Sequence, residues 1–415
     1  MGPSTLFDKS FLEMLNVDEA ALFDVLFSAV ISPLFYVEVL ADLEKDDPRT
    51  RTREKVVSDI ARKTPVAHSY PNVSHLSLCL NELLGDRIPM RGAPAIQGAV
   101  PVRHHGQVAL VFRQSPESKA FARWQRQQFH DVERSFAAVW RSSLNSLDNA
   151  ALADLTGTAF RIDESPKNLK HAFEIAKAVI ERNDQNFLNL KLGYQSLGLD
   201  PSMWRAVVKR WKFTGHRPIP EYAPYFTYCL LVDLFFNIAM TKKMISPDRS
   251  SNRVDMGYLY YLPFAKLFVS NDNLHKRVTP FFLRDDQQLV NGAELKNDLA
   301  ALDQHYSSLP KEELEKGLFI VASQPPDDEQ YLTTRLWKAY GRLRTSAEKP
   351  TLRTNQKNEL VGRIRQLIAQ SKRPAGGTFE RKDLMDPEHQ MLERLLPRQW
   401  GKWTFLSVNE DDKPG

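Results

Sequence analysis

Cysteine is scarce in this chain, since only Cys79 and Cys229 occur among its 415 residues. Two cysteines so far apart in sequence form neither a zinc-binding pair nor a disulfide framework. We therefore expect a reducing compartment and assign the protein to the cytoplasm. The N-terminal segment has no basic stretch followed by an apolar one, so it predicts no secretory signal.

Long hydrophobic runs are also missing. The longest, at residues 224–240, is interrupted by Asp233 and Asn237. It is short for a bilayer crossing and predicts a buried helix, so no membrane partner is expected. Neither a Walker-type phosphate-binding loop nor a GxGxxG motif occurs, and no internal repeat of fixed period is found.

The chain does have a hydrophobic content of 42%, enough for a substantial core, and its length suggests two or three domains. Its formal net charge of +5 is mild, but basic residues are clustered at 49–55, 205–217 and 335–373. Clustered cations are candidate contacts for a nucleic-acid backbone. A solvated helix face is the alternative for each cluster.

An alternation of strands and helices begins at the N-terminus. The first hydrophobic segment predicts a short buried strand that ends at Asp8, and residues 29–31 favour a second strand. Ser32 followed by Pro33 predicts a helix with a capping side chain and a proline in its first turn. Glu38 falls about one turn into this helix.

The middle of the chain, from about residue 46 to residue 249, has a different pattern. Loops rich in proline and glycine come first, with a predicted strand at 107–113. Helical patterns then dominate. We expect helices at residues 116–144, 166–183, 201–212 and 222–244.

The alternating pattern returns after Pro247. Asp255 is expected to open a helix at 256–266, and a strand at 267–270 ends just before Asp272. A further strand and helix are predicted at 280–283 and 291–306. In the polar, basic C-terminal region we expect helices at 331–344 and 358–370, a loop at 373–377, and a mobile acidic end at 409–415.

Four acidic residues thus lie where a predicted strand ends or a helix begins, namely Asp8, Glu38, Asp255 and Asp272. In an open α/β sheet, a carboxylate at the end of a strand points into the crevice where ligands bind. Converging carboxylates can hold hard divalent cations, which neutralise phosphoryl oxygens and activate a water molecule. Without metal, such carboxylates repel one another, and at least one should have a raised pKa.

Together these segments resemble a PIN-domain nuclease. The resemblance rests on residues 6–10 (LFDKS), residues 31–38 (ISPLFYVE), and Asp255 followed at short range by residues 268–272 (FVSND). It implies a doubly wound parallel sheet with helices on both faces. It also implies cleavage of RNA with one or two Mg²⁺ or Mn²⁺ ions, as in many toxins of toxin–antitoxin pairs.

Carried over residue by residue, the resemblance assigns the metal-binding and catalytic quartet to Asp8, Glu38, Asp255 and Asp272. Ser10 and Ser270 match hydroxyl positions that would orient a ligand or a bound water. We therefore divide the chain into a PIN-like α/β core, a mainly helical insertion and a basic helical extension. Their bounds are 1–48 and 249–309 for the core, 49–248 for the insertion and 310–415 for the extension.

The predicted function is metal-dependent phosphodiester hydrolysis by an endonuclease, with RNA favoured over DNA, in a toxin-like or defence effector. The insertion is a candidate site for a protein inhibitor or for homo-oligomer contacts. A catalytically inactive scaffold or nucleic-acid-binding protein with the same fold is the alternative. A haloacid-dehalogenase-like phosphatase is disfavoured, because Ser10 stands where that family has a second aspartate.

Several other polar residues are assigned structural roles. Asp42 is expected to be an exposed neighbour on the helix of the second acidic residue, and Asp233 to meet a basic or hydroxyl group within its apolar helix. His275 is expected to be a surface or structural histidine. The tyrosines of segment 258–261 are assigned to the core, and Asn252-Arg253 either to the site entrance or to a loop.

Overall fold

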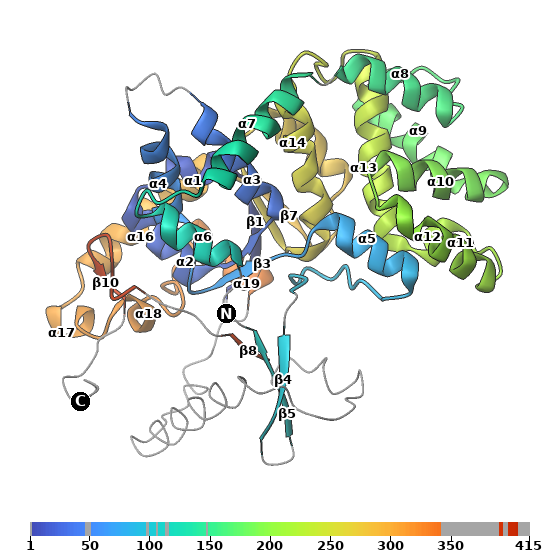
Figure 1. Cartoon of the computed structure of the whole chain (residues 1–415). Coiled ribbons are helices and arrows are strands. Elements are labelled where there is room, and N and C mark those ends of the chain that lie inside the picture. Colours follow the sequence, from blue (N-terminus) through green and yellow to red (C-terminus); the bar gives the residue numbers. More distant parts are fainter. Residues whose placement is uncertain are drawn as a thin grey trace.

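A computed structural model of the protein describes residues 2–45, 51–96, 99–104, 107–112, 116–146, 148–341, 390–392 and 397–405. At its centre lies a five-stranded parallel sheet in the order β3-β2-β1-β6-β7 (Figure 1). The strands are β1 Ser4–Phe7, β2 Ser28–Ile31, β3 Ser69–Pro71, β6 Leu267–Ser270 and β7 Gln288–Asn291. The protein therefore has the predicted α/β class.

The three central strands are short apolar runs that are almost completely buried. Such runs are typical of parallel strands that are covered on both faces. Leu6 of β1 lies opposite Val30 of β2 on one side and Phe268 of β6 on the other. Strands β2 and β3 lie on one side of β1, and β6 and β7, which come later in the sequence, lie on its other side. Strand order therefore reverses between β1 and β6. Open α/β sheets bind ligands at such a point, beyond the carboxyl ends of the strands.

Capping residues determine where helices around the first two strands begin. These helices are α1 Lys9–Met14, α2 Val17–Leu26, α3 Pro33–Ala41, the 3-10 turn η1 Asp42–Glu44 and α4 Arg53–Lys63. Asn16 and Glu19 form a reciprocal capping box at the start of α2. The Ser32 side chain accepts a hydrogen bond from the Phe35 backbone N–H, which confirms the predicted start of α3.

A helical region follows β3, and most of its helices lie on the right in Figure 1. It contains α5 His75–Leu84, α6 Pro116–Trp124, α7 Asp131–Ser146, α8 Asn149–Ala159, α9 Leu169–Glu181, α10 Asn186–Ser196, α11 Trp204–Phe213, α12 Ile219–Tyr222 and α13 Pro224–Thr241, with 3-10 turns η2 Asn183–Gln185 and η3 Pro201–Met203. Helix α13 packs against α5, α8 and α9. Among the described residues it is the one helix long and apolar enough to cross a membrane, but 72% of it is buried inside the protein, as in a core helix.

The chain returns to the sheet through α14 Ser251–Tyr258 and the 3-10 segment η4 Leu259–Phe264. Beyond β6 it continues with α15 Asn273–Val278, η5 Thr279–Phe281, α16 Gly292–Ser307, α17 Lys311–Leu314, α18 Leu318–Val321 and α19 Leu332–Tyr340. Strands β4 Ala99–His104 and β5 Gln107–Phe112 pair in antiparallel fashion, and β8 Gln390–Leu392 joins β5. A hairpin of β9 Gln399–Trp400 and β10 Trp403–Thr404 packs against α2.

Three sequence-based predictions of secondary structure were wrong. The apolar segment 280–283 is not a strand, because Pro280 lies in the first turn of η5 and the Phe282 ring packs 5.3 Å from that of Phe235. The helix predicted at 116–144 is two helices, α6 and α7, with Gln127 at a positive φ of 57° in the connection. Helix α14 begins at Ser251, so Asp255 lies within it rather than at its start.

The sheet also continues beyond residue 48, where the sequence analysis placed the start of the insertion. Strand β3 pairs with β2 and α4 packs against α2, so both belong to the core. The strand predicted at 107–113 is observed as β5. The predictions for 358–370, 373–377 and 409–415 lie outside the described residues.

Candidate active site

Two of the four acidic residues follow directly on the central strands. Asp8 comes after β1, and its Oδ1 atom accepts a hydrogen bond of 2.8 Å from the Phe11 backbone N–H at the start of α1. Asp272 comes after β6, and its Oδ1 atom accepts one of 2.6 Å from the Leu274 N–H at the start of α15. Both residues are therefore helix caps at the carboxyl edge of the sheet.

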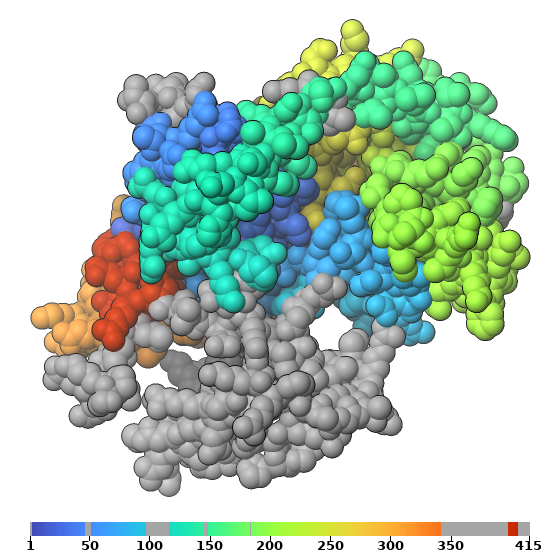
Figure 2. Space-filling model, in the orientation of Figure 1, coloured from blue at the N-terminus to red at the C-terminus, as the bar shows by residue number. Residues whose placement is uncertain are grey.

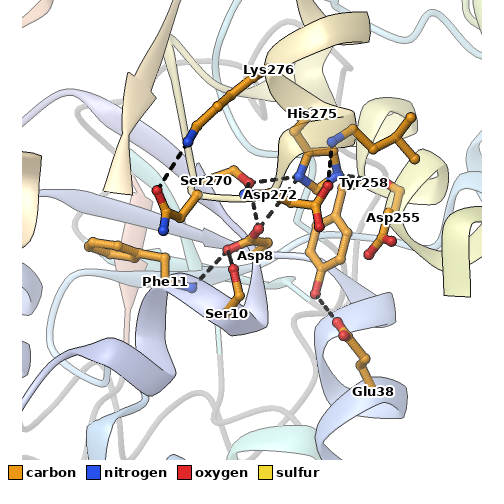
Figure 3. A network of polar contacts seen from close by, with 12 residues as sticks. Asp8, Ser10, Phe11, Glu38, Asp255, Tyr258, Ser270, Asp272, His275 and Lys276 are labelled. Carbon is orange, nitrogen blue, oxygen red and sulfur yellow. Dashed lines mark hydrogen bonds and ion pairs between the residues drawn. The ribbon is translucent and has the colours of Figure 1, made fainter. Parts of the chain in front are cut away.

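The predicted hydroxyl residues both contact Asp8 (Figure 3). Ser270 Oγ donates to Asp8 Oδ2 at 2.6 Å, and Ser10 Oγ donates to Oδ1 at 3.0 Å. Burial alone would raise the pKa of Asp8, but the hydrogen bond and charge of His275, with the bonds from Ser270 and Phe11, hold that pKa below its ordinary value. Asp8 is thus a fixed, ionised carboxylate.

His275 lies at the centre of this network and is completely buried. Its Nε2 atom lies 2.8 Å from the Asp255 backbone oxygen, so Nε2 is the donor. Its Nδ1 atom lies 2.7 Å from Ser270 Oγ and 3.5 Å from Asp8 Oδ2. Burial would lower the pKa of His275, but the hydrogen bond and charge of Asp8 raise it above its usual value.

Of the two roles expected for His275, the surface one is wrong and the structural one is confirmed, but its pairing with Asp8 was not predicted. A local signal existed, because His275 stands in the first turn of the helix that Asp272 caps. A side chain there lies close to the strand end that carries the acid.

Glu38 reaches the cluster from α3. Its Oε2 atom accepts a hydrogen bond of 2.6 Å from the hydroxyl of Tyr258, the last residue of α14. Burial is the main reason that the pKa of Glu38 is raised, and the nearby charges of Asp8 and Asp42 add to it. Tyr258 is fully buried, as the assignment of the 258–261 tyrosines to the core predicted for it.

The pKa of Asp255 is affected by the charges of the other three acidic residues. Burial raises its pKa to about 7, and the charges of Glu38, Asp272 and Asp8 contribute in the same direction, while His275 opposes them. Such a shift was predicted for at least one member of the quartet. In Figure 3 all four acidic side chains lie around His275 and Tyr258.

Lys9 and Asp42 form a second buried pair beside the quartet. Lys9 Nζ lies 2.6 Å from Asp42 Oδ2 and 3.4 Å from Glu13 Oε1. Burial would lower the pKa of Lys9, but the charges of Asp42 and Glu38 raise it. The expectation that Asp42 is exposed was wrong, since only 2% of it is accessible. A buried lysine needs a counter-charge, and the end of α3 supplies it.

Carboxylate oxygens are the ligands that Mg²⁺ and Mn²⁺ prefer, so the donor chemistry fits the ions implied by the family resemblance. The arrangement of the side chains is less compact than a metal site requires. In the parts of the chain that the structure describes, no three His, Cys, Asp or Glu side chains form a group that could hold a metal ion. The oxygens of Asp8 and Glu38 are instead engaged by hydrogen bonds within the protein.

Residues next to Asp255 connect the site to the helical region. Arg253 Nη1 lies 3.6 Å from Asp233 Oδ1 of α13, and its guanidinium lies 5.3 Å from the centre of the Phe236 ring. Asn252 donates a 2.8 Å hydrogen bond to the Ser246 backbone oxygen. The prediction that Asp233 meets a basic or hydroxyl group is therefore confirmed. The alternative that Asn252-Arg253 form a loop is wrong, because both residues lie within α14.

The fold and site define an α/β protein with a cluster of acidic side chains at the carboxyl edge of its parallel sheet. Comparisons with protein-family models, with curated proteins and with solved structures found no match.

Proposed function

We propose that the protein is a metal-dependent nuclease that hydrolyses phosphodiester bonds, with RNA favoured over DNA as its substrate. The observation that carries the proposal is the gathering of Asp8, Glu38, Asp255 and Asp272 beyond the carboxyl ends of β1 and β6. This is the edge at which open α/β sheets bind ligands. The parallel sheet, with its reversal of strand order, also supports the resemblance to PIN-domain nucleases.

Electrostatics support a cation at this place. Burial raises the pKa of Asp255 to about 7, and repulsion from the charges of Glu38, Asp272 and Asp8 contributes in the same direction. A bound Mg²⁺ or Mn²⁺ would remove that repulsion, neutralise phosphoryl oxygens and lower the pKa of a water molecule.

The protein's own groups would prepare the site. Ser10, Ser270 and His275 orient Asp8. Glu38, Asp255 and Asp272 are only partly buried, so they remain accessible to a ligand. Lys9, paired with Asp42, places a fixed positive charge beside Glu38.

The alternative is a catalytically inactive scaffold or nucleic-acid-binding protein with this fold. The observation that favours it is the engagement of the acidic oxygens by Tyr258, Ser270 and the Phe11 backbone, with no preformed metal group among the described side chains.

Cleavage assays separate the two functions. Purified protein, freed of bound partners, is incubated with labelled RNA and DNA in Mn²⁺ or in EDTA. We expect Mn²⁺-dependent cleavage that falls at least about a hundredfold in Asp8→Asn and Asp272→Asn. Asparagine also caps helices well, so both variants should fold, which thermal melting checks. The control, Asp285→Asn, removes an exposed carboxylate outside the site and should cleave normally.

Two results would oppose the proposal. Cleavage that persists in EDTA or in both site variants would exclude the acidic cluster as the catalytic centre. A complete absence of cleavage of every nucleic acid would favour the inactive scaffold.

A further inference from the structure

A cavity of about 670 Å³ lies apart from the acidic cluster. It is bounded by the start of α2, the end of β2, α3, α6, the segment that follows α4, and the C-terminal hairpin. In Figure 2 the hairpin (red) lies beside the teal atoms of α6 on this face of the molecule. No member of the acidic quartet lines the cavity. Its volume is in the range of small-molecule sites.

Three aromatic side chains, Tyr36, Phe121 and Trp400, form apolar walls of the cavity, and each is less than 10% exposed. The Phe121 ring lies 4.8 Å from that of Tyr36 and stacks on Phe35 at 5.8 Å. Trp400 Nε1 donates a 2.8 Å hydrogen bond to the Arg62 backbone oxygen. These contacts hold the walls rigidly, which lowers the entropy cost of binding a planar group.

Two arginines, Arg62 and Arg126, also line the cavity, and both are exposed. Within the described ranges, neither guanidinium forms a hydrogen bond or an ion pair. No Asp or Glu appears among the described lining residues. The cavity therefore combines aromatic surface with two available positive groups. A guanidinium is suited to two parallel hydrogen bonds with a phosphate.

We propose that this cavity binds a small organic phosphate with a planar ring, of the nucleoside monophosphate class. The phosphate contacts Arg62 and Arg126, and the ring packs against the aromatic walls. A ring that stacks on aromatic side chains gains affinity largely independent of base identity, so all four bases should bind. The ligand is either a free nucleotide or the phosphorylated end of a strand, because both present the same chemistry.

The C-terminal hairpin is part of this site. Its Lys402 N–H donates a 2.8 Å hydrogen bond to Asp18 Oδ1 at the start of α2. A ligand that contacts both Trp400 and Phe121 would join the hairpin to α6, so binding should raise the melting temperature of the protein.

Calorimetric titration tests the proposal in EDTA, which removes divalent ions from the acidic cluster. The probes are the four nucleoside monophosphates, the matching nucleosides, ribose 5-phosphate and a 5′-phosphorylated oligonucleotide. We expect saturable binding of the monophosphates, with affinity reduced about tenfold in Arg62→Gln and in Arg126→Gln. Arg249→Gln, which removes an exposed arginine just before α14, is the matched control and should bind normally.

The outcomes are distinct. Binding of the oligonucleotide end without the free nucleotides supports the ligand chemistry and identifies a strand as its source. If none of the probes binds, or if binding is unchanged in both arginine variants, the proposal is wrong. Asp8→Asn should bind the same nucleotides, so this result is independent of whether the acidic cluster cleaves nucleic acid.

Discussion

Single residues of the site differ in how far the sequence predicts them. Asp8, Asp272 and the two serines lie at strand ends whose local pattern is clear, and they meet as expected at one edge of the sheet. The hydrogen bond from Tyr258 to Glu38 joins residues 220 positions apart. The buried Lys9–Asp42 pair likewise depends on how α3 packs on α1. No local signal specifies such contacts.

Glu82 illustrates a buried acid outside the site. It lies on α5, and its Oε2 atom accepts a 2.9 Å hydrogen bond from the Phe226 N–H at the start of α13. Burial raises its pKa from 4.5 to about 7. The unfolded chain releases this proton at lower pH than the folded protein does. The free energy of unfolding therefore falls as pH rises between these two values.

We predict that Glu82→Gln removes this fall in the free energy of unfolding at high pH, because glutamine keeps the acceptor oxygen without the charge. The variant should gain roughly 2–3 kcal/mol over the wild type at pH 8 and little at pH 5. Urea denaturation at the two pH values measures the difference. Glu221→Gln, an exposed carboxylate before α13, is the control. An equal effect of Glu82→Gln at both pH values would contradict the assignment.

Among the elements, helix starts were easier to predict than short apolar segments. Ser32 and Pro33 carry the start signal of α3 within two residues, so this helix begins where expected. The segment 280–283 has the composition of a strand, but the ring of Phe282 packs against Phe235 of α13 and the segment forms no strand. Packing partners decide between strand and helix in such short segments, and they are not visible in sequence.

Helix α11 carries the basic cluster predicted at 205–217. Arg205, Lys209 and Lys212 share one helix face and are exposed, and in the described part of the chain none of them forms an ion pair. Phe213 follows with 89% of its surface accessible. Exposed cations beside an aromatic ring are suited to single-stranded nucleic acid.

We predict that the double variant Lys209→Gln/Lys212→Gln weakens RNA binding several-fold and lowers the magnitude of the salt slope by about 2. Fluorescence anisotropy in EDTA at several salt concentrations measures both quantities. The control is Lys170→Gln/Lys177→Gln, with the same charge change on α9. Equal losses in the two double variants would show that net charge alone, and not α11, governs binding.

At the level of the whole molecule, an ion pair connects the helical region to the part of the chain that carries the site. The Asp233–Arg253 pair joins α13 to α14, the helix that also carries Asp255. Burial raises the pKa of Asp233, and the charge of Arg253 opposes that rise. Removing the arginine alone would leave a buried carboxylate without its cation.

We predict that Arg253→Met destabilises the protein by about 3 kcal/mol, whereas Asp233→Asn/Arg253→Met recovers much of that loss. Chemical denaturation of the wild type, both single variants and the double variant gives the coupling energy. Arg249→Met, just before α14, serves as the exposed control. Additive single effects would show that the two side chains are not coupled.

The pairing of β1 with β6 has a consequence for protein synthesis. Thr5 lies beside Leu267, so the two central strands are separated by the whole helical region. A ribosome adds about 5–20 residues each second, and the nascent chain cannot pair these strands until the second has emerged. Asp8 and Glu38 are thus synthesised tens of seconds before Asp255 and Asp272. Until Asp272 has left the ribosome, the nascent chain carries only half of the acidic cluster, so the nuclease activity that we propose could not yet act on the messenger from which the chain is made.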